Sequence, residues 1–120
     1  MDYKELADYI FPDIKDISYY EALYPKRDLP EGAAVTRFAP SPTGFLHIGG
    51  LFSALIDEKL AKQTNGVFIL RIEDTDKKRE LENGVQGILD SLKAFDIVPD
   101  EGVTGEDTEK GAYGPYTQSK

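Results

Sequence analysis

The stretch RFAPSPTGFLHIGG, at residues 37–50, is the most informative part of the sequence. It places two prolines, three glycines, an arginine and the only histidine of the chain directly before a helical pattern. Pro40 and Pro42 fix φ and leave Ser41 little freedom between them, whereas Gly44 can take backbone angles that are closed to other residues. A rigid loop that leads into a helix in this way predicts the mouth of a nucleotide site.

The residues on either side of this loop predict an α/β fold. VTRFA (35–39) is a short β-prone run, and VFILRI (67–72) is a nearly continuous apolar run of the kind found in strands covered on both faces. A helix is predicted after the loop and a second one over 81–95, although Gly84 and Gly87 within the second each cost roughly 1 kcal/mol relative to alanine. The order strand, loop, helix, strand, helix is the βαβα pattern of a parallel sheet. The apolar face of the first helix is predicted to contain Leu51, Ala54, Leu55, Ile56, Leu60 and Ala61.

Residues 1–32 are predicted to form a short helical leader ahead of a domain at 33–120. Apolar residues at helical spacing end at Pro12, and a second short aromatic helix ends at Pro25. No pattern in the leader points to chemistry. The tail from Asp100 onward is polar and rich in glycine, so the predicted sheet has only two strands.

Composition limits the classes of function. A chain of 120 residues with 40% apolar and 30% charged residues fits one globular domain. No run approaches the ~20 apolar residues of a membrane span, and the absence of cysteine excludes disulfides and thiolate metal sites, so a cytoplasmic chain is expected. A net charge of −8, with a basic cluster only at residues 77–79, is unusual for a module that binds nucleic acid alone. Most of the grip on any polynucleotide would therefore come from elsewhere.

The loops that follow the two predicted strands are expected at one edge of the sheet, where α/β proteins bind ligands. In the first loop, N–H groups at Gly49 and Gly50 and the helix dipole favour phosphate, and His47 can donate a hydrogen bond in either protonation state. The alternative is a proline turn before an ordinary helix, with His47 as a partly buried packing residue.

The second loop carries the carboxylates Glu73, Asp74 and Asp76, for which three roles are open. They could stabilise the start of the next helix, collect a hard cation such as Mg²⁺, or hold an ammonium group of a substrate. We expect structural roles for Asp74 and Asp76. Glu73 follows the apolar strand directly and is the best candidate to face the cleft.

The motifs RFAPSPTGFLHIGG and FILRIEDTD together resemble the catalytic domain of the glutamyl-tRNA synthetases, which are class I aminoacyl-tRNA synthetases. HIGG is similar to the His-Ile-Gly-His motif of that class, and DEG (100–102) and GPYTQS (114–119) match in order. The resemblance covers residues 35–120 and implies the N-terminal half of a Rossmann-like nucleotide-binding fold.

The resemblance also implies a reaction in two steps. Glutamate and ATP, with Mg²⁺, form glutamyl-adenylate, and the glutamyl group then passes to tRNA. Arg37 would pair with the side-chain carboxylate of glutamate in a pocket lined by Ala39 and Ser41, and Glu73 would receive the α-ammonium. The residues implied to contact ATP are Thr43, His47, Ile48, Gly49 and Gly50. The residues implied to be catalytic are His47, Gly49 and Gly50. The resemblance implies no resident cofactor, no protein-bound metal and no covalent nucleophile, and the composition gives no reason to expect membrane contact.

Several parts of such an enzyme have no counterpart in this sequence: the second half of the nucleotide fold, the Lys-Met-Ser-Lys-Ser loop and the anticodon-binding helices. The chain is therefore expected to be an N-terminal piece of a synthetase, with negligible charging activity alone and a tendency to self-associate. Two alternatives stay open. One is a paralogue that attaches glutamate to a modified tRNA base, and the other is a non-catalytic nucleotide-binding module.

Overall fold

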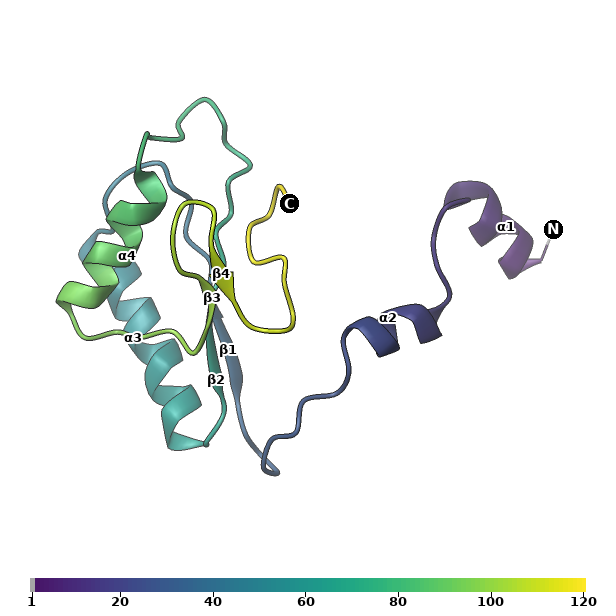
Figure 1. The fold of residues 1–120 in the computed structure, drawn as a ribbon, viewed down its shortest axis with the longest axis horizontal. Helices are drawn as coiled ribbons and strands as arrows, with labels where there is room; N and C mark the ends of the chain where they lie inside the picture. Colours follow the sequence, from purple (N-terminus) through teal and green to yellow (C-terminus); the bar gives the residue numbers. More distant parts are fainter. Residues whose placement is uncertain (1) are drawn as a thin grey trace.

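The computed structural model describes residues 2–120, which form an α/β domain with an N-terminal arm (Figure 1). The strands are β1 (Val35–Phe38), β2 (Val67–Leu70), β3 (Glu101–Val103) and β4 (Glu109–Lys110). They form one sheet in the order β1-β2-β3-β4, in which the first three are parallel and β4 is antiparallel to β3. The predicted α/β class and the parallel βαβα order are confirmed.

Two helices, α3 (Ile48–Gln63) and α4 (Gly84–Ala94), cover one face of the sheet (Figure 1). Their apolar side chains pack on those of the central strand β2. The chain leaves α3 where predicted, because Asn65 has φ 55° and the following Gly66 lies directly against Ala34. The core is formed mainly by Leu51, Ala54, Ala61, Phe68, Leu70, Ile72, Val85, Ile88 and Leu92.

The arm is the segment before the domain, residues 2–32, and contains α1 (Tyr3–Ile10) and α2 (Ile17–Leu23), neither of which has a buried residue. A capping box between Asp2 and Glu5 begins α1. Both helices lie where the spacing of apolar residues predicts them. Among the helices within residues 2–120, none combines the length and the apolar composition that a membrane crossing needs.

The buried face of α3 differs from the predicted one. Ala54 and Ala61 are fully buried and let the helix approach the sheet closely, so only a narrow stripe of the helix is covered. Glu58 completes this stripe, with its carboxylate paired to Lys62. The predicted positions that are instead 36–47% exposed are Leu55, Ile56 and Leu60.

The expectation that the VFILRI run is covered on both faces is also wrong for residues 2–120. Phe68 and Leu70 are fully buried under the helices, whereas Val67 and Ile69, which point to the other face, are only partly buried. The alternation continues on β1, where Val35 is 48% exposed. Both α3 and α4 lie on one side of the sheet, so the second face of the sheet keeps apolar surface.

The second helix begins later than predicted, at Gly84, and the glycine has a positive role there. A Cβ atom at this position would lie 2.5 Å from the carbonyl oxygen of Pro42, so only glycine allows the helix to start against the proline loop. Strand β3 was not predicted at all. Gly102 within it has φ +117° and lies against the backbone of Leu70. The strand has only three residues, and its sequence contains no pattern that predicts this contact.

Alanine substitutions at the two glycines of α4 should have opposite effects on stability. Gly84→Ala forces a Cβ against Pro42 and should lower the free energy of unfolding by about 1–3 kcal/mol. Gly87→Ala meets nothing within 4 Å and should raise it by roughly 0.5–1 kcal/mol through helix propensity. Urea unfolding of both variants measures the difference. Equal effects would show that the helix start is not packed on the loop.

Candidate active site

The backbone pairing of β1 and β2 continues beyond the ends of both strands. The N–H of Arg71 donates to the carbonyl of Phe38 at 2.9 Å, and the N–H of Glu73 donates to the carbonyl of Pro40 at 3.0 Å. The proline loop and the carboxylate loop are therefore joined by main-chain hydrogen bonds, which do not depend on side-chain identity. Both motifs lie at one edge of the sheet, as the order of the elements predicts.

This edge brings Arg37 and Glu73 together. Nη1 of Arg37 lies 3.8 Å from Oε1 of Glu73, and the two side chains are 53% and 40% exposed. At this distance and exposure the pair contributes at most about 1 kcal/mol. A ligand that offers its own carboxylate to Arg37 and its own cation to Glu73 can therefore separate the pair at little cost.

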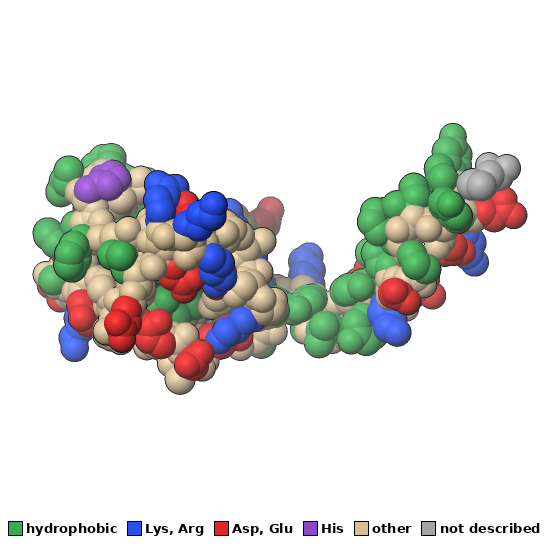
Figure 2. All heavy atoms as spheres, turned by 90° about the horizontal axis from the view of Figure 1, so that it is seen from above, with side chains coloured by type: hydrophobic (Ala, Val, Ile, Leu, Met, Phe, Trp, Pro, Cys, Tyr) green, Lys and Arg blue, Asp and Glu red, His purple; other side chains and the backbone are tan. Residues whose placement is uncertain are grey.

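His47 is the N-cap residue of α3. Its Nδ1 accepts a hydrogen bond from the N–H of Gly49 at 3.1 Å, so the neutral ring carries its proton on Nε2 and offers that group outward. The side chain is exposed (Figure 2), which rules out the alternative of a packing residue. Gly49 favours the cap, because a Cβ there would lie 2.9 Å from Cε1 of His47 and would displace the ring.

The capping changes which N–H groups are open to a ligand. Gly49 was expected to offer its N–H to phosphate, but this group is taken by His47. The N–H groups of Ile48 and Gly50, also in the first turn of α3, have no intrahelical carbonyl to bond and are left for groups outside the helix.

A cavity of about 420 Å³ lies between the proline loop and the start of α3. It contains four of the predicted site residues, Ser41, Thr43, His47 and Gly50. The predicted residues that do not line it are Arg37, Ala39, Ile48, Gly49 and Glu73. The structure therefore places the charged pair beside the cavity rather than within it.

Asp74 and Asp76 have structural contacts, as expected. Asp74 is buried, which by itself raises its pKa, but hydrogen bonds from Ser119 and Lys77 outweigh burial and lower the pKa to about 2. Asp76 holds Arg79. The basic cluster at 77–79 is thus largely neutralised by neighbouring carboxylates. Within residues 2–120, no three or more His, Asp or Glu side chains are grouped so as to hold a metal ion.

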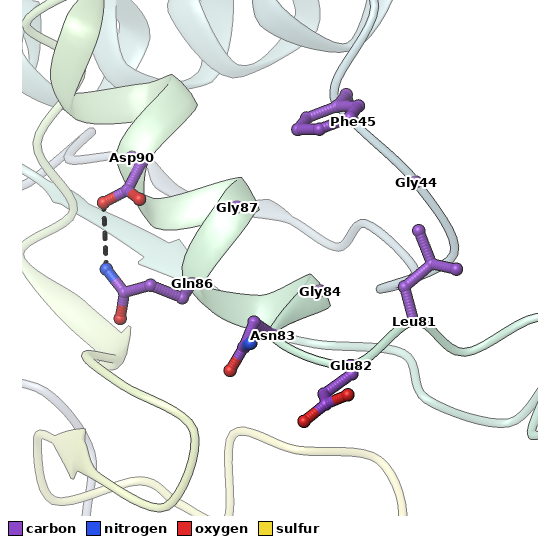
Figure 3. A pocket seen from close by; sticks show the side chains of 9 residues that line it. All are labelled: Gly44, Phe45, Leu81, Glu82, Asn83, Gly84, Gln86, Gly87 and Asp90. Atoms are coloured by element: carbon purple, nitrogen blue, oxygen red, sulfur yellow. Dashed lines mark hydrogen bonds between the residues drawn. The ribbon is translucent and has the colours of Figure 1, made fainter.

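The residues around the start of α4 were missed by sequence reasoning. A cavity of about 290 Å³ separates Gly44 and Phe45 of the loop from the first turns of α4, where Gln86 donates to Asp90 at 2.9 Å (Figure 3). Asn83, in the left-handed region with φ 58°, turns the chain into the helix. The Asn-Gly dipeptide at 83–84 is a turn signal that could have placed this boundary.

The segment 116–119 closes the other side of Glu73. The N–H of Ile72 donates to the carbonyl of Tyr116 and the N–H of Gln118 donates to the carbonyl of Ile72, both at 2.9 Å. The backbone N–H of Ser119 donates to Asp74 at 3.0 Å. Glu73 is therefore held from one side by the proline loop and from the other by this segment.

The chain matches the family described as tRNA synthetases class I (E and Q), catalytic domain, over residues 33–120, and it belongs to that family. It is 57% identical to a glutamate–tRNA ligase from Clostridium perfringens (strain 13 / Type A) over 121 residues, which covers all of this chain and 22% of the relative. The solved structure of a glutamate-tRNA synthetase from Elizabethkingia anophelis matches with a TM-score of 0.67 and 45% identity, over 73% of this chain and 17% of that one. A glutamate tRNA ligase from Elizabethkingia meningosepticum, solved in complex with its amino acid, matches with a TM-score of 0.63 and 45% identity over 72% and 16%.

These comparisons confirm the resemblance read from the two motifs. The chain spans about a fifth of the length of the curated relatives that it matches.

The buried carboxylate of Asp74 should make stability depend on acid pH. Its folded pKa of about 2 lies below the ordinary 3.8, so its contribution is complete above pH 3.8 and is lost as the pH falls toward 2. The free energy of unfolding, measured in urea at several pH values, should therefore fall more steeply over this range in the unmodified chain than in Asp74→Asn. Asp107→Asn, the same charge change at a side chain that is 92% exposed, should follow the unmodified chain. Parallel curves for all three would contradict the assignment.

Proposed function

We propose that this chain carries the amino-acid side and part of the nucleotide side of the active site of a glutamate–tRNA ligase. The observation that carries the proposal is the meeting of Arg37 and Glu73 at the sheet edge beside the loop cavity. Membership of the synthetase family and the ligases named among the relatives support it. They favour a ligase over the glutamyl transferase and over a non-catalytic module.

The two charges fit glutamate in one orientation. The planar fork of Arg37 suits the side-chain carboxylate, since two parallel N–H donors match two carboxylate oxygens. Glu73 then faces the α-ammonium. Ala39 and Ser41 follow Arg37 on the proline loop and are assigned to the same pocket, and Ser41 also lines the neighbouring cavity.

ATP, with Mg²⁺ as part of the substrate, is assigned to the cavity between the proline loop and α3. Nε2 of His47 and the N–H groups of Ile48 and Gly50 point outward from the positive end of the helix, where phosphate is favoured. Thr43 lines the same cavity. Gly49 contributes indirectly, because its lack of a side chain lets His47 cap the helix.

In the first step, the α-carboxylate of glutamate attacks the α-phosphorus of ATP, and pyrophosphate leaves. In the second, a hydroxyl of the terminal tRNA ribose attacks the activated carbonyl and AMP leaves. The residues of this chain form no covalent bond with the substrates; they orient glutamate and place hydrogen-bond donors near the developing phosphate charge. With a net charge of −8, the chain supplies little of the grip on tRNA. We assign the reaction to the cytoplasm, as the composition of the chain suggests.

A chimera tests this proposal. The 120 residues replace the matched segment of the Clostridium perfringens ligase, to which they are 57% identical, and glutamate-dependent pyrophosphate exchange is measured with tRNA present. We expect exchange with glutamate and not with glutamine. A chimera that is folded but inactive with glutamate would contradict the proposed function.

Within the chimera, Glu73→Gln keeps the size of the side chain and removes its charge. The KM for glutamate should rise roughly 10- to 100-fold, as expected for losing a charged hydrogen bond to the ligand, while the KM for ATP changes little. Asp76→Asn, the same change at the Arg79 partner, is the matched control and should leave both constants near their starting values. Identical kinetic effects of the two substitutions would remove Glu73 from the amino-acid site.

A further inference from the structure

Four contacts join the end of the arm to the C-terminal part of the domain. The guanidinium of Arg27 grips the carboxylate of Glu101 with both terminal nitrogens, and Nη2 lies 2.8 Å from Oε2. The same guanidinium lies 3.9 Å from the centre of the Tyr113 ring. Two further bonds cross nearby, from the Tyr24 hydroxyl to the carbonyl of Gly114 at 2.9 Å and from the Tyr113 hydroxyl to that of Pro25 at 2.8 Å. We call Arg27, Glu101, Tyr113 and Tyr116 the clasp.

The ion pair of the clasp is well covered, whereas the helices of the arm are exposed. The side chains of Arg27 and Glu101 are 18% and 16% exposed, whereas no residue of α1 or α2 is buried. The hydrogen bond from Arg27 holds the pKa of Glu101 below its ordinary value despite partial burial. Bidentate geometry and low exposure distinguish this pair from the loose surface pairs of the chain. Without Arg27, the carboxylate of Glu101 would be left covered and without its cation.

Glu101, which is held by Arg27, in turn holds the hydroxyl of Tyr116. The Tyr116 hydroxyl donates to Oε2 of Glu101 at 2.9 Å and accepts from the N–H of Tyr113 at 3.0 Å. Tyr116 as a whole is 3% exposed and belongs to the core. Tyr116 therefore has its hydroxyl fixed by the clasp, while its carbonyl accepts the N–H of Ile72 at 2.9 Å.

The chain of contacts that starts at Arg27 therefore reaches the residues next to Glu73. Tyr116 begins the segment 116–119, which bonds to Ile72 and to Asp74, the residues on either side of Glu73. No other described element holds this side of Glu73, since the proline loop contacts it from the opposite side. Arg27 lies outside residues 33–120, the part of the chain that matches the synthetase family.

We propose that Arg27 is a positioning residue for the amino-acid site: through Glu101 and Tyr116 it fixes the segment 116–119, and this segment fixes Glu73. The inference rests on the proposed role of Glu73 toward the ammonium of an α-amino acid. Under this proposal, the end of the arm helps to position the amino-acid site, although it lies outside residues 33–120 that match the family.

Amide hydrogen exchange in the 120-residue chain tests whether Arg27 fixes the segment 116–119, and it does not depend on activity. Arg27→Ala should speed exchange at the Ile72 and Gln118 amides by about tenfold, because their bonds to the segment open more often. The amide of Val67, bonded to Ala34 at the far end of β2, should not change and reports that the fold is intact. Lys26→Ala is the matched control on the neighbouring residue. If Arg27→Ala does not fold, Arg27→Lys serves instead, since it keeps the charge but loses the fork.

Whether the segment positions Glu73 for the amino acid is measured in the chimera described above. Arg27→Ala should raise the KM for glutamate by about tenfold, in line with a small displacement of a binding group, and leave the KM for ATP and kcat nearly unchanged. Arg27→Lys should restore part of the loss. A role confined to stability would move no single KM selectively.

Two results would overturn the proposal. Unchanged exchange at Ile72 and Gln118 in Arg27→Ala would show that the clasp does not hold the segment, whatever the protein does. Faster exchange with an unaltered KM for glutamate would show that the segment does not position Glu73. A chimera that is inactive with Arg27 in place would instead contradict the proposed function, and the exchange measurement would still decide whether Arg27 holds the segment.

Discussion

The candidate site depends on one constraint, the continuation of the β1–β2 pairing past the ends of both strands. Main-chain bonds from Arg71 to Phe38 and from Glu73 to Pro40 carry the register of the sheet into the two loops. Because these bonds are formed by the backbone, the loops stay joined whatever side chains they carry. Sequence then decides only which groups project from a fixed edge. In this chain these groups include Arg37, near the end of β1, and Glu73, in the loop that follows β2, which carry opposite charges.

The site combines rigid support with exposed working groups. Pro42 is fully buried, and the first residue of α4 packs on its carbonyl, so the centre of the proline loop cannot shift without disturbing the core. Arg37, Glu73 and His47, in contrast, are substantially exposed and make weak or purely capping contacts. Groups that are weakly engaged in the free protein can change partners when a ligand arrives, whereas their backbone positions are already set. This division is what binding of a small charged substrate requires.

Much of this arrangement was predictable from sequence, and the failures have physical reasons. The proline loop, the apolar run of β2 and the helical spacing around them are local signals, and they gave the fold class and the shared edge correctly. Contacts between segments distant in sequence were not predictable. Sequence alone predicts that Gly84 destabilises the helix, because its contact with Pro42 joins residues that are far apart in the chain. Strand β3 is short and polar, and its pairing depends on a glycine that approaches Leu70. The capping of α3 by His47 likewise follows from geometry that no residue pattern reveals.

The central claim is that Glu73 receives the ammonium group of an amino acid whose side-chain carboxylate is held by Arg37. A cycle that combines a change in the ligand with a change in the protein tests it most directly. Binding of glutamate and of glutarate, which keeps both carboxylates but has no ammonium, is measured calorimetrically for the chimera and for its Glu73→Gln variant. The account predicts that losing the ammonium weakens binding strongly in the parent and little in the variant, with a coupling free energy of about 2 kcal/mol. A coupling near zero, with both proteins losing the same affinity for glutarate, would contradict it.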